Sequence, residues 1–319
     1  MKLKFWGTRG SLPVALSLDQ LRGKLADVLI ANDGRRHADR TAALAFVTTA
    51  LPFELGGGFG GNSSCVQVLT GTDDYLLCDA GSGLRAFGNH VLGERAGKPA
   101  CFHILMSHMH WDHIMGFPFF TPAFIPGNRI YIYGFHAELE TAFKRQHGSP
   151  SFPVPWSALG ADIQFVQLQA DAPREIAGIQ VTPKLQLHEG DSFGYRLEQH
   201  GRVCVYTTDS EHKPEDFEQM DAFAQFFRNA DVVVFDAMYS LADAVSLKED
   251  WGHSSNVVGV ELCQMAGARH LVLFHHEPVF DDARIATILA ETQRLEEITR
   301  EDGPALRISA AYDGMELDV

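Results

Sequence analysis

The chain alternates short apolar runs with segments of helical periodicity from one end to the other. The apolar runs are rich in Val, Ile, Leu, Tyr and Phe, and most are bounded by Gly, Asp or Ser, which is typical of β-strands. The pattern predicts strands at residues 2–6, 65–69, 75–78, 102–106, 129–133, 163–168, 193–197, 203–207, 232–235, 271–274 and 306–310. Strands separated in this way by helical segments indicate an α+β fold with two sheets.

Apolar residues spaced by three and four positions mark the helical segments. They fall on one helix face in two sets, Leu18, Leu21, Leu25 and Leu29, and Ile285, Ile288, Leu289, Leu295 and Ile298. Asp281 or Asp282 would cap the second helix. No repeat or convincing linker divides the chain, so we expect one domain over 1–319, with two helices inserted at about 14–59. The insertion is expected to be a lid over a cleft or a surface for homodimer formation.

Composition and charge narrow the classes of protein. The 319 residues have a mass of 35.2 kDa, enough for a substantial core without disulfides. Lys and Arg total 26 against 41 Asp and Glu, and the net charge of −15 argues against dedicated duplex nucleic-acid binding. No apolar stretch approaches the roughly 18 residues of a membrane span, and the start MKLKFWGTRGSLP lacks the apolar core of a signal peptide. The five cysteines are scattered, so we expect buried thiols in a cytoplasmic protein.

The fifteen histidines are unevenly distributed, and the decisive group follows a predicted strand. In the segment ILMSHMHWDHIMG, four candidate ligands come close together: His108, His110, Asp112 and His113. Residues i and i+2 of an extended segment share a side, so His108 and His110 can bind one ion together. Asp112 and His113, where the chain turns toward a helix, can point to a second ion. Imidazole and carboxylate suit Zn²⁺ and, less selectively, Mn²⁺ or Fe²⁺.

Further candidate ligands stand alone at the ends of apolar runs. His188 follows the run around 185–187, Asp209 follows VCVYTT, and His275 follows LVLF. A carboxylate at a strand end, such as Asp209, could bridge two cations. Taken singly, the three residues have ordinary alternatives as a surface turn, a helix cap and a core histidine. Taken in order with the first group, they form a pattern specific for a two-metal site.

That order resembles the metallo-β-lactamase superfamily over nearly the whole chain, from Phe5 to about Glu277. Shorter motifs are similar to its ribonuclease Z-like and cyclic-nucleotide phosphodiesterase branch, namely FWGTRGS, LLCDAGSGL, SFGYRLE, and GHSS followed by a helix and a final histidine. The resemblance implies an αββα sandwich, in which two mixed β-sheets are flanked by helices and hold one or two metal ions at the sheet edges.

The resemblance also implies roles for individual residues. One metal ion would be bound by His108, His110 and His188, and the other by Asp112, His113 and His275, with Asp209 bridging the two. Asp79 would support the ligands from behind. His253 would not be a ligand but would face a substrate phosphate. His275 is favoured over the adjacent His276 because the preceding LVLF matches the strand before the family's last ligand.

Two departures from the family pattern restrict the activity. Ribonuclease Z carries a long arm that clamps tRNA between the SFGYRL strand and the strand of the bridging aspartate. Here only QHGR separates Glu198 from Val203, which, with the net charge of −15, argues against tRNA maturation. The branch that hydrolyses β-lactams commonly has Cys where Asp209 stands, so antibiotic hydrolysis is disfavoured.

We therefore expect a metal-dependent hydrolase in which a hydroxide bridging two divalent ions attacks a small phosphodiester such as a cyclic nucleotide. Zn²⁺ is the expected metal, with Mn²⁺ or Fe²⁺ as alternatives. Asp112 would orient the hydroxide or accept its proton, and His253 would stabilise a phosphate oxygen and protonate the leaving alkoxide. A group of aromatic residues could wall a pocket for a base or simply belong to the core, namely Trp111, Phe117, Phe119, Phe120, Phe124 and Trp156. The alternatives are a lactonase or thioesterase of the same superfamily and a metal-dependent ligand-binding protein.

Overall fold

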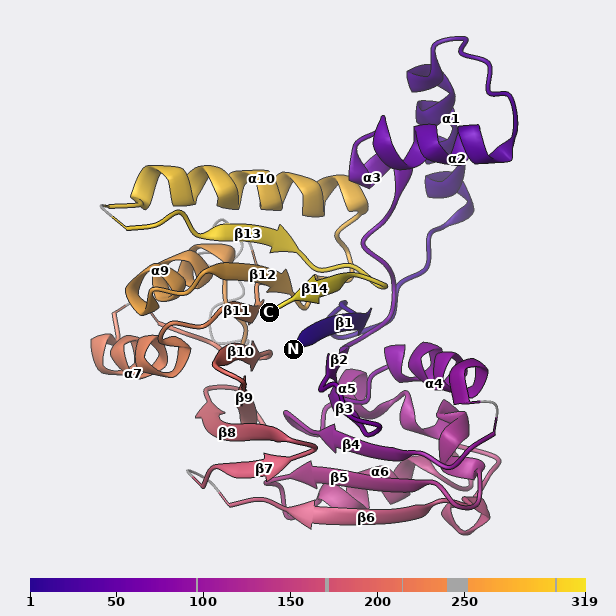
Figure 1. Ribbon diagram of the computed structural model, residues 1–319, viewed down its shortest axis with the longest axis vertical. Coiled ribbons are helices and arrows are strands. Elements are labelled where there is room, and N and C mark those ends of the chain that lie inside the picture. The colour runs from indigo at the N-terminus through magenta and orange to yellow at the C-terminus, as the bar shows by residue number, and fades with distance from the viewer. Residues whose placement is uncertain (96, 170–171, 214, 240–251, 302) are drawn as a thin grey trace.

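Two seven-stranded sheets face each other in the computed structural model, which describes residues 1–95, 97–169, 172–213, 215–239, 252–301 and 303–319 (Figure 1). The first has the order β14 (Glu316–Asp318), β1 (Lys2–Gly7), β2 (Cys65–Leu69), β3 (Tyr75–Cys78), β4 (Cys101–Leu105), β5 (Arg129–Gly134) and β6 (Asp162–Gln167). The second has the order β13 (Arg307–Ala310), β12 (His270–Phe274), β11 (Val232–Asp236), β10 (Arg202–Thr207), β9 (Ser192–Gln199), β8 (Ile179–Gln186) and β7 (Arg174–Ile176). Both sheets are mixed, since β3 to β6 and β10 to β13 run parallel and the other neighbours antiparallel.

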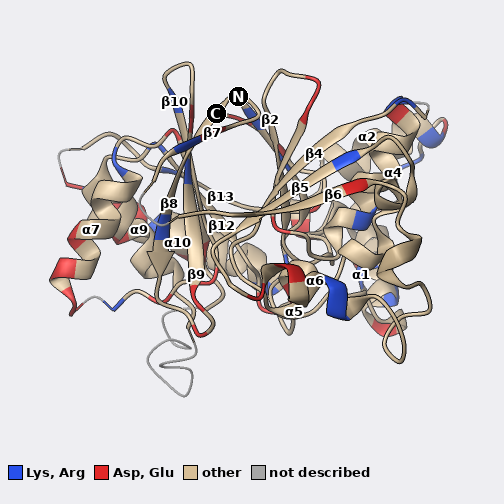
Figure 2. Cartoon of the chain, turned by 90° about the horizontal axis from the view of Figure 1, so that it is seen from below, with Lys and Arg blue, Asp and Glu red and all other residues tan. Residues whose placement is uncertain are grey.

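Helices cover the outer faces of both sheets, which makes the fold the predicted αββα sandwich (Figure 2). The first sheet is covered by α4 (Gly83–Arg95), the short α5 (Trp111–Ile114) and α6 (Leu139–Gln146), with short 3₁₀ turns at Phe117–Phe119, Thr121–Phe124 and Trp156–Ala158. The second sheet is covered by α7 (Phe217–Phe227), α9 (Asn256–Ala266) and α10 (Asp282–Thr299).

Alternate side chains of each strand fill separate layers of the core. In β12, Val272 and Phe274 pack between the two sheets, whereas Leu271 and Leu273 pack under the helices of the second sheet. Because such a central strand is buried on both faces, its sequence is a continuous apolar run without polar alternation.

Every predicted strand lies within two residues of an observed one at each end, and the pattern misses β7, β8 and β14. β7 and β14 have only three residues each. Pro183 interrupts the pattern of β8. Because β7 pairs with β8 only as far as Val181, β8 is an edge strand beyond that point, where proline is tolerated.

The segment predicted as a two-helix insertion contains three helices, α1 (Leu18–Asn32), α2 (Arg40–Thr49) and α3 (Phe53–Gly56). None of them has a buried residue, and Figure 1 shows α1 and α2 projecting beyond the sheets. The predicted apolar face is therefore exposed, at Leu18, Leu21, Leu25 and Leu29. An ion pair of 2.6 Å between Lys24 Nζ and Asp282 Oδ2 joins α1 to the first turn of α10. A lid and a dimer surface both stay predictions for this face.

Side-chain caps fix the starts of the longer helices. Asp281, one of the two candidates, is the N-cap of α10 and accepts a hydrogen bond from the backbone N–H of Arg284 at 2.8 Å. Ser17 and Gln20 form a reciprocal capping box at the start of α1. Among the described residues, no helix combines the length and apolar character that crossing a membrane requires.

Candidate metal centre

All the side chains predicted as metal ligands come together at one end of the sandwich, where parallel strands of both sheets end. The loop 106–110 after β4 carries His108 and His110, and α5 adds Asp112 and His113. From the second sheet, His188 follows β8, Asp209 follows β10 and His275 follows β12. The residues lie far apart in the sequence, and the parallel arrangement of the strands brings them to one place.

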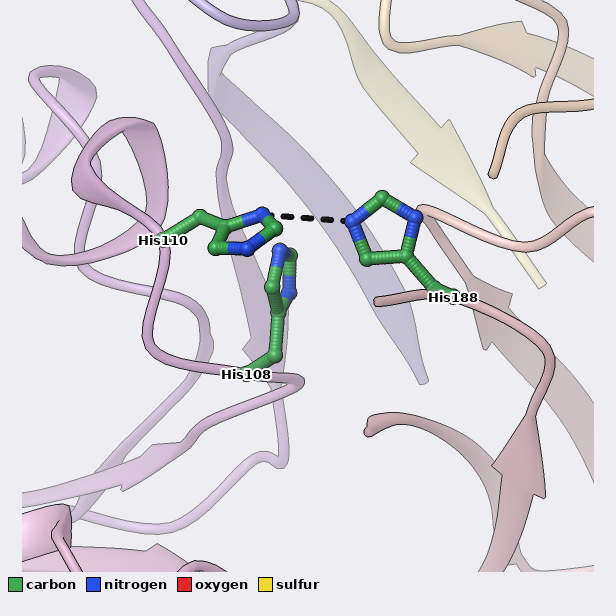
Figure 3. A group of neighbouring side chains, drawn as sticks. All are labelled: His108, His110 and His188. Atoms are coloured by element: carbon green, nitrogen blue, oxygen red, sulfur yellow. Dashed lines mark hydrogen bonds between the residues drawn. The ribbon is translucent and has the colours of Figure 1, made fainter. Parts of the chain in front are cut away.

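The first group consists of three imidazoles, His108, His110 and His188 (Figure 3). One nitrogen from each lies within 4.8 Å of the others. His188 Nε2 is 3.2 Å from His110 Nδ1, the separation of two ligands that share one ion. His108 is buried, whereas His110 is exposed and His188 half-buried, so this group opens toward solvent.

The second group is fully buried and contains two carboxylates, with the members Asp112, His113, Asp209 and His275. His113 Nε2 lies 3.2 Å from Asp112 Oδ2 and 3.1 Å from Asp209 Oδ1. His275 Nε2 lies 3.3 Å and 3.2 Å from the same two oxygens. This group therefore carries the negative charge that the first group lacks.

Asp209 lies between the two groups and presents one oxygen to each. Its Oδ2 is 3.7 Å from His108 Nε2 and 3.8 Å from His188 Nε2, in the first group. Its Oδ1 faces His113 and His275 in the second group. A carboxylate oriented in this way can bind one ion through each oxygen, which is the bridging geometry.

Imidazole nitrogens without partners support the fit of this centre to cations. His108 Nε2 and His113 Nε2 are buried and have no hydrogen-bond partner. Leaving such atoms unpaired in the interior costs free energy unless they bind something else. His and Asp side chains are the ordinary ligands of Zn²⁺, and imidazole also suits Fe²⁺ while carboxylate suits Mn²⁺. The donor set therefore fits divalent metal ions.

The pKa values of the ligands differ between the two groups, because one group consists of imidazoles and the other includes carboxylates. Burial, with mutual repulsion among the imidazoles, lowers the pKa of His108, His110 and His188, so they are neutral donors. Burial alone would raise the pKa of Asp112 and Asp209, but the surrounding imidazoles hold both pKa values well below the usual range. The carboxylates of Asp209, Asp112 and Asp79 outweigh burial and raise the pKa of His113 well above its usual value, so the second group holds a proton that a bound cation would replace.

Asp79 positions the ligand loop from behind, as the resemblance implies. Its Oδ2 accepts a hydrogen bond from His113 Nδ1 at 2.8 Å and from the Tyr206 hydroxyl at 2.7 Å. Its Oδ1 accepts from the Ser107 backbone N–H at 2.8 Å. Because Nδ1 of His113 then carries the proton, Nε2 is left with a lone pair directed into the centre.

Two other ligands are held in place by the backbone. His188 Nδ1 donates to the carbonyl of Gly252 at 2.7 Å, which leaves Nε2 free to bind a metal. Gly10 lies in the loop that follows β1. A side chain at this position would place its Cβ 2.6 Å from His275 Nδ1, so only glycine allows this loop to approach the imidazole ring. The next residue, Ser11, donates its backbone N–H to Asp112 Oδ2 at 2.8 Å.

Three acidic or imidazole side chains of the centre lie on left-handed backbone. Asp79, Asp209 and His275 have φ values of 62°, 45° and 60°, and each lies one or two residues after the end of a strand. Residues other than glycine adopt this region at a cost of roughly 1–3 kcal/mol each. The fold thus holds these side chains in the centre against their local preference.

His253 lies beside both groups without belonging to either of the main ligand sets. Its ring lies 5.2 Å from that of His188 and 5.1 Å from that of His275, between centroids. Its Nδ1 is 2.9 Å from Asp236 Oδ2. Burial would lower the pKa of His253, but Asp236, helped by Asp209 and Asp112, raises the pKa to about 9. The side chain can therefore present a proton to the centre at neutral pH.

Asp236 is the principal residue of the centre that the sequence interpretation missed. It ends β11 after the run VVVF, just as Asp209 follows VCVYTT, so the same signal of a carboxylate at a strand end could have found it. The ambiguity between the adjacent histidines is resolved by geometry. His275 lies in the centre, whereas His276 is turned away and its Nε2 is 2.8 Å from the carbonyl of Ala311.

A cavity of about 1030 Å³ is lined in part by the segment that carries the first ligands. Its wall includes Met109 of the loop 106–110, Trp111 and Ile114 of α5, and the following Met115 and Gly116, while α4 and α6 contribute Arg85, Ala142, Arg145 and Gln146. Of the predicted aromatic wall, Trp111 and Phe119 line the cavity with exposed rings. Phe117 and Phe120 are fully buried in the core instead. Among the described residues, no Asp or Glu lines the cavity.

Comparison with known proteins identifies the family. Residues 74–276, more than half of the chain, match the family described as Beta-lactamase superfamily domain. The chain therefore belongs to the beta-lactamase superfamily. The fold of this superfamily implies divalent metal ions at the His and Asp cluster, and its members include metal-dependent hydrolases.

Individual relatives are distant. The uncharacterized protein Rv1339 of Mycobacterium tuberculosis is 27% identical over 209 residues, which cover 60% of this chain and 68% of the relative. Among solved structures, the metallo-beta-lactamase fold protein YhfI from Bacillus subtilis is 18% identical, with a TM-score of 0.64 and coverage of 99% and 97%. A diphosphatase of the PhnP family is 19% identical, with a TM-score of 0.59 and coverage of 100% and 97%. Human tRNase Z, short form, is 17% identical, with a TM-score of 0.57 and coverage of 100% and 99%. At these identities the structures show the shared fold.

Proposed function

We propose that this protein is a phosphodiesterase that hydrolyses a small, anionic phosphodiester such as a cyclic nucleotide at a centre of two divalent ions. The observation that carries the proposal is the cavity lined in part by the ligand-bearing segment, where the described residues present two arginines and no carboxylate in a chain with a net charge of −15. A cavity of this charge, next to a cluster that fits cations, favours an anionic substrate over a neutral one.

The two arginines are available to a ligand. Arg85 lies near the start of α4 and Arg145 in the last turn of α6, and both side chains are exposed. Within the described part of the chain, neither guanidinium is committed to an ion pair or a side-chain hydrogen bond. Guanidinium groups bind phosphate through paired, charge-assisted hydrogen bonds. An exposed Trp111 on the same wall provides a ring on which a base can stack.

The residues of the centre then take defined roles. The seven predicted ligands, His108, His110, Asp112, His113, His188, Asp209 and His275, hold the metal ions. Two divalent ions in such a site lower the pKa of bound water toward ~7 and neutralise charge on the phosphate. Asp112 orients the nucleophile or accepts its proton. His253, held protonated by Asp236, donates a hydrogen bond to a phosphate oxygen and a proton to the leaving alkoxide.

The hairpin after β9 supports a small substrate. β9 and β10 are joined by His200 and Gly201 alone, with φ values of 51° and 73° that fit a tight hairpin turn. Between β9 and β10 the chain thus has no arm at the position where ribonuclease Z clamps tRNA, which supports a substrate smaller than tRNA. The similar diphosphatase of the PhnP family is consistent with a small phosphate ester.

A lactonase or thioesterase of the same superfamily would use the same centre on an acyl carbon. One experiment distinguishes the phosphodiesterase from the lactonase or thioesterase. The metal-loaded protein is assayed against 3′,5′- and 2′,3′-cyclic nucleotides, bis(p-nitrophenyl) phosphate, an acyl-homoserine lactone and a thioester. We expect hydrolysis of phosphodiesters that a chelator abolishes. Turnover of the lactone or the thioester with no cleavage of any phosphodiester would overturn the proposal.

A further inference from the structure

A second cluster of metal-binding side chains lies at the opposite end of β4 from the candidate metal centre. It consists of Asp74, in the loop before β3, and Cys101 and His103, at the start and middle of β4. Cys101 and His103 are two residues apart in the strand, so their side chains share one face of the sheet. A five-residue strand spans about 13 Å between its first and last residues, which separates this cluster from the ligand loop.

The distances from His103 Nε2 to the other two donor atoms match those of ligands around one tetrahedral ion. His103 Nε2 is 3.4 Å from Cys101 Sγ and 3.5 Å from Asp74 Oδ2, and all three atoms lie within 4.8 Å of one another. For Zn–S of about 2.3 Å and Zn–N and Zn–O of about 2.0 Å, tetrahedral angles give N···S of about 3.5 Å and N···O of about 3.3 Å. The observed separations agree with these values within about 0.2 Å.

The ring of His103 is oriented from behind, as a ligand would be. Its Nδ1 is 2.8 Å from the Tyr133 hydroxyl, so Nε2 is the nitrogen that faces Cys101 and Asp74. Stacking on Tyr131 and Tyr133, with centroids 5.2 Å and 5.8 Å away, fixes the plane of the ring. A second partner on the other nitrogen is the usual arrangement of metal-binding histidines.

Burial favours the neutral imidazole of His103, which can bind a cation, whereas the Cys101 thiol must first lose its proton. Cys101 and His103 are buried, while the Asp74 side chain is 41% exposed and leaves the cluster accessible from solvent. Burial, with Arg129, lowers the pKa of His103 despite Asp74, which favours the neutral imidazole. Burial and Asp74 raise the pKa of the Cys101 thiol, and Arg129 opposes them. A divalent ion that displaces the thiol proton would leave a site without net charge.

We propose that Asp74, Cys101 and His103 form a separate site for one divalent ion of the zinc type, with its fourth position open to solvent. A thiolate together with an imidazole selects Zn²⁺ over Mg²⁺ or Ca²⁺. The site is independent of the proposed hydrolysis, because none of its residues belongs to the candidate metal centre or the cavity.

Sulfur gives this site a signature that the main centre does not have. The main centre contains only His and Asp ligands, and Cys101 alone among the five cysteines belongs to a group able to hold a metal in the described residues. Full-length protein, freed of metal and loaded with Co²⁺, should therefore show thiolate-to-cobalt charge-transfer absorption in the near ultraviolet. Cys101→Ser should abolish this band, and Asp74→Asn should weaken Co²⁺ binding at the site by about 10-fold or more.

The matched control is Cys263→Ala, which removes a buried thiol on α9 outside the cluster and should keep the band. Zinc counting by mass spectrometry should give one equivalent less in Cys101→Ser than in the wild type. Absence of the band from the wild type at saturating Co²⁺, or its persistence in Cys101→Ser, would overturn the proposal. Should Cys101→Ser fail to fold, the wild-type spectrum and Asp74→Asn, a change in an exposed loop, still decide it.

Discussion

The metal centre and the cavity beside it are built from the same loop but have opposite charge. Between 106 and 116, His108 and His113 point into the centre, while Met109 and Trp111 line the cavity. The centre contains buried carboxylates, whereas the cavity is lined by arginines and, among the described residues, by no carboxylate. One segment thus presents metal-binding side chains to the centre and apolar or aromatic side chains to the cavity. Substitutions in the centre should therefore lower metal content or turnover, whereas substitutions in the cavity should raise KM.

Asp209→Ala should have the largest effect, because it removes the carboxylate that faces both ligand groups. We expect loss of bound metal and a fall in phosphodiester turnover of about 10³-fold or more, equivalent to about 4 kcal/mol. The measurement is metal content by mass spectrometry together with kcat/KM. Asp221→Ala, an exposed carboxylate on α7, is the control and should change neither. Full metal content in Asp209→Ala would contradict the bridging role.

His253→Ala should lower turnover without lowering metal content, because His253 is assigned to the substrate and not to the ions. For a cyclic nucleotide, whose alkoxide must be protonated to leave, we expect a loss in kcat of about 10²-fold. For bis(p-nitrophenyl) phosphate the loss should be much smaller, since p-nitrophenolate leaves without a proton. Asp236→Asn should reproduce this dependence on the leaving group in weaker form. Equal losses on both substrates would rule out the acid role.

The double variant Arg85→Ala with Arg145→Ala tests the cavity side of the comparison. Loss of both guanidinium groups should raise KM for an anionic diester by about 10-fold, with a smaller change in kcat and unchanged metal content. Arg22→Ala, an exposed arginine on α1, serves as the matched control. An unchanged KM would show that the substrate does not use this cavity.

Trp111→Ala should have the smallest effect and sharpens the same test. Stacking on an aromatic side chain contributes about 1 kcal/mol or more per base, so KM for a cyclic nucleotide should rise about 5-fold. Trp111 lies between two ligands in the sequence, and therefore metal content must be measured in parallel. Phe217→Ala removes a similarly exposed ring on α7, away from the cavity, and should leave KM as it is. A loss of metal in Trp111→Ala would assign the residue to the centre instead.

The sandwich and the residues of the metal centre could be predicted from the sequence because their signals are local. Continuous apolar runs mark strands buried on both faces, and a histidine or aspartate directly after such a run marks the strand end. His108, Asp209 and His275 were recognisable for this reason. The three-residue strands β7 and β14 carry too few positions for any pattern, and Pro183 disguises β8.

The cavity and the second cluster had no such signal. Arg85 and Arg145 lie on two helices that only the folded chain brings to one wall, and exposed arginines on helices are common. Asp74 lies in a loop, and Cys101 and His103 alternate within an apolar strand, where each fits the pattern of a core residue. Their spacing becomes informative only when distances are known. The sequence therefore predicts most helices and strands, but it does not predict which side chains of different elements come into contact.

The left-handed backbone at Asp79, Asp209 and His275 has a consequence for anyone who selects this protein for thermal stability alone. Glycine adopts that conformation without strain, so Asp209→Gly would relieve backbone strain and buried charge at once. A screen that scores melting temperature without metal or turnover would favour such variants, and each would carry a damaged catalytic centre. At Asp209, selection for melting temperature and selection for metal binding would therefore favour different residues.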